Sequence, residues 1–298
     1  MIVSRATQTD GTPVELRIDD LLVTGKIFLP VPPWIQYFNW LGKLLLGQDY
    51  SHTESKPVRA VIFTYAYETI KLQLAALILS LIIAIPIGVV SATKQYSLLD
   101  NTAMTAALFG VSLPVFWTGL MALLLFSYYI PIFPFGGAYP ITYSGDPSTN
   151  LLDGIYYYFI LGGWHMILPT LILGTAGAAL ITRLVRSSML EVLRQDYIMT
   201  ARSKGVRERL VVYKHALRNS LIPVVTVVGV NVAFLIAGAA LTETVFNWPG
   251  LGRIAVAAAL RRDYYLVLGI NITIGVIVMV TNLLTDVSYA FLDPRIRY

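Results

Sequence analysis

Five stretches of the sequence are apolar over the length needed to cross a lipid bilayer, and they constrain the fold more than any other feature. They cover residues 72–92, 102–128, 162–182, 221–241 and 265–285. A helix needs about 20 apolar residues to span the hydrocarbon core. Within that core every backbone hydrogen-bonding group must be satisfied inside the protein, which favours helices. With 56% hydrophobic and 13% charged residues, the chain is predicted to be an all-α polytopic membrane protein with five spans.

The residues before the first span form a separate, more polar segment. We predict an external N-terminal segment over residues 1–60 and a transmembrane domain over residues 61–298. The segment includes four aromatic residues at amphipathic spacing, Trp34, Tyr37, Phe38 and Trp40. Aromatic side chains of this kind favour a membrane–water interface, but ordinary packing beneath a loop explains them equally well.

The basic residues are concentrated between the third and fourth stretches. Residues 183–217 hold eight of the 22 Lys and Arg residues, whereas residues 95–182 hold none. Lys and Arg near the ends of spans resist translocation. The loop 183–220 and the C-terminus are therefore predicted to be cytoplasmic and the N-terminus external, in a cell (plasma) membrane. The net charge of +5 does not indicate nucleic-acid binding, because the charge lies beside apolar spans.

The basic loop has an internal pattern that a simple connection would not need. Gly205 interrupts a helical pattern and predicts a turn. An apolar stripe at helical spacing follows, with the next span entered near Pro223: Val206, Leu210, Tyr213, Leu217 and Leu221. Two interpretations remain open, a basic helix lying on the membrane surface and a docking surface for a partner.

The sequence contains no recognisable catalytic or metal-binding motif. It has no cysteine, and the phosphate-binding pattern Gly-x-x-x-x-Gly-Lys-Ser/Thr is absent, so we expect no cofactor, metal or catalysis in this chain. Glu243 and Asp286 fall at the ends of spans and are expected at the membrane interfaces. The polar residues inside spans are Asn231, Asn271 and Asn282, for which an interhelical hydrogen bond and a place along a translocation pathway are both open.

The basic loop resembles the permease subunits of ABC importers, and most closely those of the dipeptide/oligopeptide/nickel branch. Residues 195–205 read QDYIMTARSKG and residues 215–223 read HALRNSLIP. Only Ala201, Gly205 and Leu217 match the general importer pattern, and the departures follow the peptide-permease variant. Further similar stretches occur at 33–37, 40–42, 85–88, 112–117, 243–246, 248–252 and 262–264 and in the Asp-Pro-Arg tail, so the resemblance covers roughly residues 32–298.

The resemblance implies a type I importer helix bundle from which the family's usual first span is missing, either through its loss or through a start site placed too late. It further implies a pathway formed with a second, related permease, two cytoplasmic ATPases that bind ATP and Mg, and an external substrate-binding protein. The residues implied to couple to the ATPases are Thr200, Ala201, Arg202, Ser203, Lys204, Gly205, Arg207, Arg209, His215 and Leu217.

Peptides are the first expected substrate class, while oligosaccharides and nickel remain open. A membrane subunit that docks an ATPase without transporting anything is the alternative function, and an isolated channel is a third.

Overall fold

The computed structural model describes residues 14–18, 21–25, 32–46, 50–140, 151–236 and 240–292, and it divides the chain into the units Met1–Val61 and Ile62–Tyr298. The first unit contains an antiparallel hairpin of β1 (Val14–Ile18) and β2 (Leu21–Gly25), in which Ile18 pairs with Leu21. It also contains the helix α1 (Pro33–Leu46). The predicted aromatic segment lies on α1, where Trp34 and Phe38 are exposed and Trp40 is buried. We did not predict the strands, although apolar and polar residues alternate along β1.

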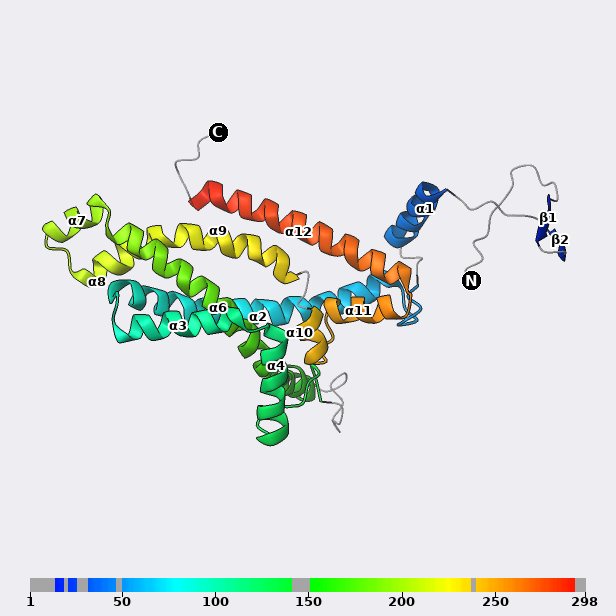
Figure 1. The fold of residues 1–298 in the computed structure, drawn as a ribbon, viewed down its shortest axis with the longest axis horizontal. Helices are drawn as coiled ribbons and strands as arrows, with labels where there is room; N and C mark the ends of the chain where they lie inside the picture. Colours follow the sequence, from blue (N-terminus) through cyan, green and yellow to red (C-terminus); the bar gives the residue numbers. More distant parts are fainter. Residues whose placement is uncertain are drawn as a thin grey trace. The chain divides into compact units, whose positions relative to one another are not determined.

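The regular elements in the described part of the second unit are all helices (Figure 1). Its long helices are α2 (Val58–Thr93), α3 (Leu98–Ser112), α6 (Gly162–Leu193), α9 (Leu217–Ile236) and α12 (Tyr264–Leu292). The shorter α-helices are α4 (Val115–Leu123), α5 (Leu151–Ile155), α7 (Asp196–Ser203), α8 (Glu208–Leu210), α10 (Ala240–Val245) and α11 (Leu251–Leu260). Three π-helical turns, η1 (Leu124–Tyr129), η2 (Tyr156–Leu161) and η3 (Val211–Ala216), continue the helices before them. Helices α3 and α9 both pack against α6, and α12 packs against α9.

The number of spans differs from the predicted five. Within the described residues, three helices are long and apolar enough to cross a membrane: Val58–Thr93, Leu152–Leu193 and Tyr264–Leu283. A bent pair, Leu98–Ser112 with Val115–Tyr129, makes a fourth if it is one span. The predicted span 221–241 coincides with most of α9, but residues 237–239 lie outside the described part of the chain. The count of five is therefore not confirmed.

The predicted span 102–128 is not one straight helix. Its two halves meet at an angle of 95°, and in Figure 1 α4 lies crosswise to α3. Leu113, at the break, has the extended conformation φ −90°, ψ 135° that a residue before proline favours. Pro114, the N-cap residue of α4, has no backbone N–H with which to continue the preceding helix. The proline thus permits a break in the helix at this position.

Glycines allow α2 and α6 to approach closely. A Cβ atom at Gly88 would lie 2.7 Å from the Cβ of Val185, and one at Gly174 would lie 2.8 Å from the Cδ2 of Leu79. Small residues at helix contacts are typical of membrane bundles, where close backbone approach supplies much of the packing energy. The contact continues beyond the predicted third span, because α6 extends as one helix to Leu193.

At the opposite end of α2, the turn between α10 and α11 encloses Glu243. The side chain of Glu243 is fully buried within the described structure. Its carboxylate accepts hydrogen bonds from the Thr69 hydroxyl at 2.9 Å and the Arg253 backbone N–H at 3.0 Å. A Cβ atom at Gly250 would overlap this carboxylate, so the absence of a side chain there allows the turn to close over the acid.

Candidate functional site

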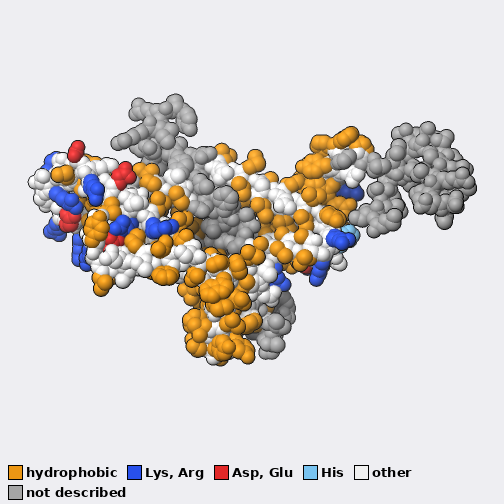
Figure 2. All heavy atoms as spheres, in the orientation of Figure 1, with side chains coloured by type: hydrophobic (Ala, Val, Ile, Leu, Met, Phe, Trp, Pro, Cys, Tyr) orange, Lys and Arg blue, Asp and Glu red, His pale blue; other side chains and the backbone are white. Residues whose placement is uncertain are grey.

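The candidate site is the basic loop, residues 183–220. It is a folded helical hairpin in the structure, made of the last turns of α6, then α7, a turn, α8 and η3, leading directly into α9. Basic side chains gather at this end of the described helices, whereas their middle is largely apolar (Figure 2). Pro223, where we expected the next span to be entered, lies inside α9. The loop and the fourth predicted span are thus joined without an interruption.

The tip of the basic loop is a glycine turn of a standard helix-ending type. Gly205 has φ +75°, a conformation that residues with a Cβ rarely adopt. Its backbone N–H donates to the carbonyl of Arg202 at 2.9 Å, and the N–H of Val206 donates to that of Ala201 at 3.3 Å. These two bonds are those of the Schellman motif, which satisfies the last carbonyls of a helix. The predicted turn at Gly205 is confirmed.

An ion pair closes the turn from the outside. Arg202 donates from Nη2 to Glu208 Oε1 at 2.7 Å and from Nε to Oε2 at 3.2 Å. The hydrogen bonds from Arg202 hold the pKa of Glu208 below its ordinary value of 4.5, so the pair is fully charged at neutral pH. Both side chains are exposed, which limits its contribution to under about 1 kcal/mol. The guanidinium of Arg202, one of the residues implied to couple to the ATPases, is thus already engaged within the chain.

A buried apolar core fixes the hairpin to the ends of the long helices. Ile198 of α7 and Val211 of η3 are fully buried in the same cluster as Met189 of α6 and Ala92 of α2. Burying an aliphatic side chain contributes about 1.5–3 kcal/mol. The tip of the loop therefore sits on a base that cannot move independently of α2 and α6.

The buried face differs from the predicted apolar stripe after Val206. Leu210 and Tyr213 are 49% and 59% exposed. The residues that face inward are instead Val211, Val212, Ala216, Ser220 and Val224. The reason is the π-helical turn η3, because a π-helical turn holds more residues than an α-helical one and changes which residues share a face. The prediction of a single stripe with α-helical spacing was wrong at this turn.

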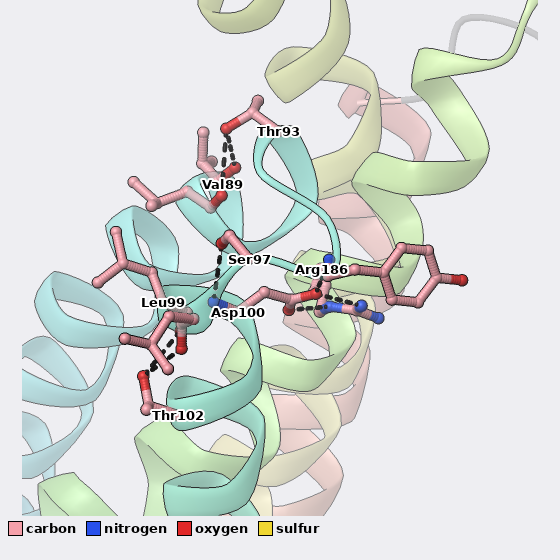
Figure 3. Close-up of polar contacts among 10 residues, drawn as sticks. Val89, Thr93, Ser97, Leu99, Asp100, Thr102 and Arg186 are labelled. Atoms are coloured by element: carbon pink, nitrogen blue, oxygen red, sulfur yellow. Dashed lines mark hydrogen bonds and ion pairs between the residues drawn. The ribbon is translucent and has the colours of Figure 1, made fainter.

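A second ion pair ties the base of the loop to the corner between α2 and α3 (Figure 3). Arg186 of α6 donates from Nε to Asp100 Oδ1 at 2.6 Å and from Nη2 to Oδ2 at 2.7 Å. Asp100 is 1% exposed, and it also accepts the backbone N–H of Tyr96 at 2.9 Å. The Ser97 hydroxyl accepts the N–H of Asp100 and caps α3. We did not identify this pair from the sequence, although Ser97-x-x-Asp100 has the spacing of a capping box.

Most of the expected coupling residues lie on one exposed tip. Thr200, Arg202, Ser203, Lys204, Gly205, Arg207 and Arg209 are exposed, whereas Ala201, His215 and Leu217 are partly buried. The side chain of Met199, which the sequence did not single out, is 58% exposed beside them. Asn219 of α9 donates to the hydroxyl of Tyr197 at 2.7 Å, which connects α7 to α9. The tip thus exposes small and basic side chains, and the contacts of α7 with the buried core and with α9 hold it in place.

Two of the three asparagines considered for a pathway, Asn271 and Asn282, lie on α12. Asn271 is exposed and donates to the carbonyl of Val267 in its own helix at 2.9 Å. Asn282 is exposed on α12, and the side chain of Asn231 lies outside the described part of the chain. For Asn271 the structure therefore shows a bond within one helix, not the interhelical bond that we considered.

Residues 84–298 match the protein family described as "Binding-protein-dependent transport system inner membrane component". Among curated proteins, the chain is 39% identical to the oligopeptide transport system permease protein AppB of Bacillus subtilis, over 97% of this chain and 90% of that protein. It is 41% identical to the dipeptide transport system permease protein DppB of Escherichia coli, over 92% of this chain and 84% of that protein.

Among solved structures, the fold is similar to a chain of the MetNI methionine ABC transporter in an inward-facing conformation. The TM-score is 0.61 and the identity 17%, over 80% of this chain and 99% of that chain. The resemblance to the peptide branch of ABC importer permeases and the predicted fold class are confirmed by these matches. The chain belongs to the family of binding-protein-dependent transport system inner membrane components, the membrane-embedded permease subunits of ABC importers.

Proposed function

We propose that this chain forms, with a second and related permease, the membrane pathway of an ATP-driven peptide importer. The proposed substrate class is carried over from the relatives, whose names specify oligopeptide and dipeptide transport. The further proposed partners are two cytoplasmic ATPases and an external binding protein. ATP and Mg would be bound by those ATPases, so this chain would contribute movement and a pathway but no catalysis.

The observation that carries the coupling role is the exposed Gly205 turn on its buried base. Gly205 follows the small residues Ala201 and Ser203, and a Cβ atom at Gly205 would meet nothing within 4 Å in the described structure. Lys204, Arg207 and Arg209 are exposed, and none of them forms an ion pair with another described residue. A small-sided tip surrounded by uncompensated cations fits a groove that is lined by carboxylates.

The connections of the loop suggest how such docking would move the spans. A displacement of α7 would be transmitted through the Ile198 core to α6, and through Arg186 and Asp100 to the corner that precedes α3. Because these contacts are buried or bidentate, the hairpin would act as a lever and not as a flexible tether. Closure of the ATPases would then favour one of two access states of the pathway. The proposed docking to cytoplasmic ATPases would require the loop to lie on the cytoplasmic side, which is the side that the distribution of basic residues predicts for the loop and the C-terminus.

The proposal is tested by reconstituting the permease pair, the ATPases and the binding protein in vesicles and measuring ATP-driven peptide uptake. Gly205→Glu places a bulky anion at the docking tip, and we expect uptake to fall by about tenfold or more, as for the loss of a central interface contact. Gly205→Ala is the matched control. It imposes the same positive φ on a side-chain-bearing residue but adds only a methyl group, so most of the uptake should remain.

The amount of ATPase that co-purifies with each variant separates docking from folding. Loss of the ATPases from a well-expressed Gly205→Glu permease supports the docking role. If the Gly205→Glu complex assembles and imports peptide at the normal rate, the coupling role is wrong. If the wild-type complex binds ATPases but moves no peptide, the chain is a docking subunit or carries another cargo.

A further inference from the structure

A cavity of about 120 Å³ lies among α2, α6 and α9, away from the basic loop. The described residues that line it are Gln73, Ala76, Leu77, Ser80, Leu173, Gly177, Leu180, Ile181 and Val228. The α2 members recur at steps of three and four and therefore occupy one face of that helix. The side chain of Leu180 is 43% exposed, so the lining reaches the surface of the subunit there.

Gln73 is the unusual member of this lining. Its side chain is 3% exposed, and its Oε1 has no hydrogen-bond partner among the described residues. Ser80, the other polar side chain that the structure describes there, donates to the carbonyl of Leu77 at 2.7 Å and is satisfied. A buried amide oxygen without a partner is costly, and such groups call for a specific explanation. The remaining lining is apolar, so the missing partner must come from outside these side chains.

We propose that Gln73 forms a hydrogen bond with the backbone amide of a peptide in transit. The inference rests on the proposed function. A side-chain amide carries one carbonyl acceptor and one NH₂ donor group. The carbonyl can accept a hydrogen bond from a peptide N–H, and the NH₂ group can donate one to a peptide carbonyl. Such a contact recognises any peptide, whatever its side chains. The apolar remainder of the cavity bears no charge that would select among them.

The geometry favours Gln73 over Asn271, one of the two asparagines on α12 that the sequence suggested. Asn271 is satisfied within its own helix at 2.9 Å, and it is exposed. Gln73 is buried, lines the cavity, and has an Oε1 without a hydrogen-bond partner among the described residues. Water is the competing partner, because the cavity is large enough for several molecules. Water would satisfy the amide but would not distinguish one peptide from another.

The test compares two substrates in two complexes. Uptake of a short peptide and of the same peptide with its backbone nitrogens methylated is measured in vesicles containing wild-type or Gln73→Met permease. Methionine keeps the length and shape of glutamine and removes the amide. The binding protein is the same in both complexes, so its own preference contributes equally to both and cancels in the ratio. Thr273→Val is the control, since it removes a hydroxyl that bonds only to its own helix on α12.

The measured quantity is the ratio of uptake of the unmethylated peptide to uptake of the methylated peptide. We expect this ratio to be about three- to tenfold higher for the wild type than for Gln73→Met, which is the range for one hydrogen bond. The preference of Thr273→Val should equal that of the wild type. If Gln73→Met discriminates against the methylated peptide as strongly as the wild type, the inference is overturned. If the wild-type complex imports no peptide, the proposed function fails first and the inference with it.

Discussion

The ion pair between Asp100 and Arg186 is predicted to decide whether the basic loop and the spans move together. Asp100→Asn keeps the shape of the carboxylate and removes its charge. Arg186→Met keeps much of the length of the arginine and removes the guanidinium. The two changes are not equivalent, because Asp100 has 1% of its side chain exposed and Arg186 has 22%.

The exposures set the expected magnitudes. Removing one partner of a buried, bidentate pair costs about 3–5 kcal/mol, because the other charge is left without compensation. Arg186→Met leaves a buried carboxylate that keeps the hydrogen bond from the Tyr96 backbone N–H but has lost its counter-charge, so its cost should lie near the upper end. Asp100→Asn leaves an arginine that water can partly reach, so its cost should lie near or below the lower end. At about 2–4 °C per kcal/mol for a chain of this size, the melting temperature should fall by roughly 6–20 °C, and more for Arg186→Met.

The assay is thermal unfolding of the purified permease in detergent, with ATP-driven uptake measured in parallel. The double variant completes a double-mutant cycle, and its loss should be smaller than the sum of the single losses by about 2 kcal/mol or more. Uptake should fall more than ATPase binding, since the docking tip remains intact while its connection to α3 is cut. Additive losses, or single variants that melt within about 2 °C of the wild type, would refute this reasoning.

Three further predictions follow from contacts in the same unit. Gly88→Ala should destabilise the permease by about 1–3 kcal/mol, since its Cβ would lie 2.7 Å from both the Cβ and the Cγ1 of Val185; the added cost of Gly88→Ala should be smaller in a Val185→Gly background, which lacks both of these atoms. Gly250→Ala should be destabilising by a similar amount, because the new methyl group displaces the buried carboxylate of Glu243, and unfolding in detergent measures it. The Arg202–Glu208 pair should stabilise the Gly205 turn at neutral pH, and this stabilisation should be lost as acid protonates Glu208, whose pKa is lowered. Hydrogen exchange of the turn amides measures the effect: the exchange rates of the wild type and of Glu208→Gln should become equal only below pH 4.5.

Local features of the sequence predicted the parts of the fold that depend on neighbouring residues. Hydropathy located the apolar stretches, because the bilayer imposes a minimum length on any spanning helix. The turn at Gly205 was predictable because a positive φ favours glycine. The basic residues of the loop are indeed gathered at one end of the described helices (Figure 2). The position of the docking tip, as distinct from its role, was therefore accessible from the sequence.

Proline shows where such local reasoning stops. Pro86, Pro169 and Pro223 lie inside helices α2, α6 and α9, while Pro114 stands at a 95° corner. Each lacks the same N–H, and membrane helices tolerate that loss when neighbouring groups compensate. Whether the chain bends at a proline depends on what packs around it, and no window of sequence contains that information.

The features that matter most for the proposed mechanism are the ones that depend on distant residues. Asp100 and Arg186 are 86 positions apart, and each looks like an ordinary loop charge until the fold brings them to 2.6 Å. Gln73 is unremarkable in the sequence, and it becomes a candidate only because α6 and α9 leave its amide facing a cavity without a partner. An importer permease needs a surface to which a partner can bind, and contacts that transmit the movement of that surface to the spans. The surface can be formed by residues that are close in sequence, whereas the transmitting contacts must join helices that are distant in sequence. A sequence pattern alone therefore identifies the surface and misses these contacts.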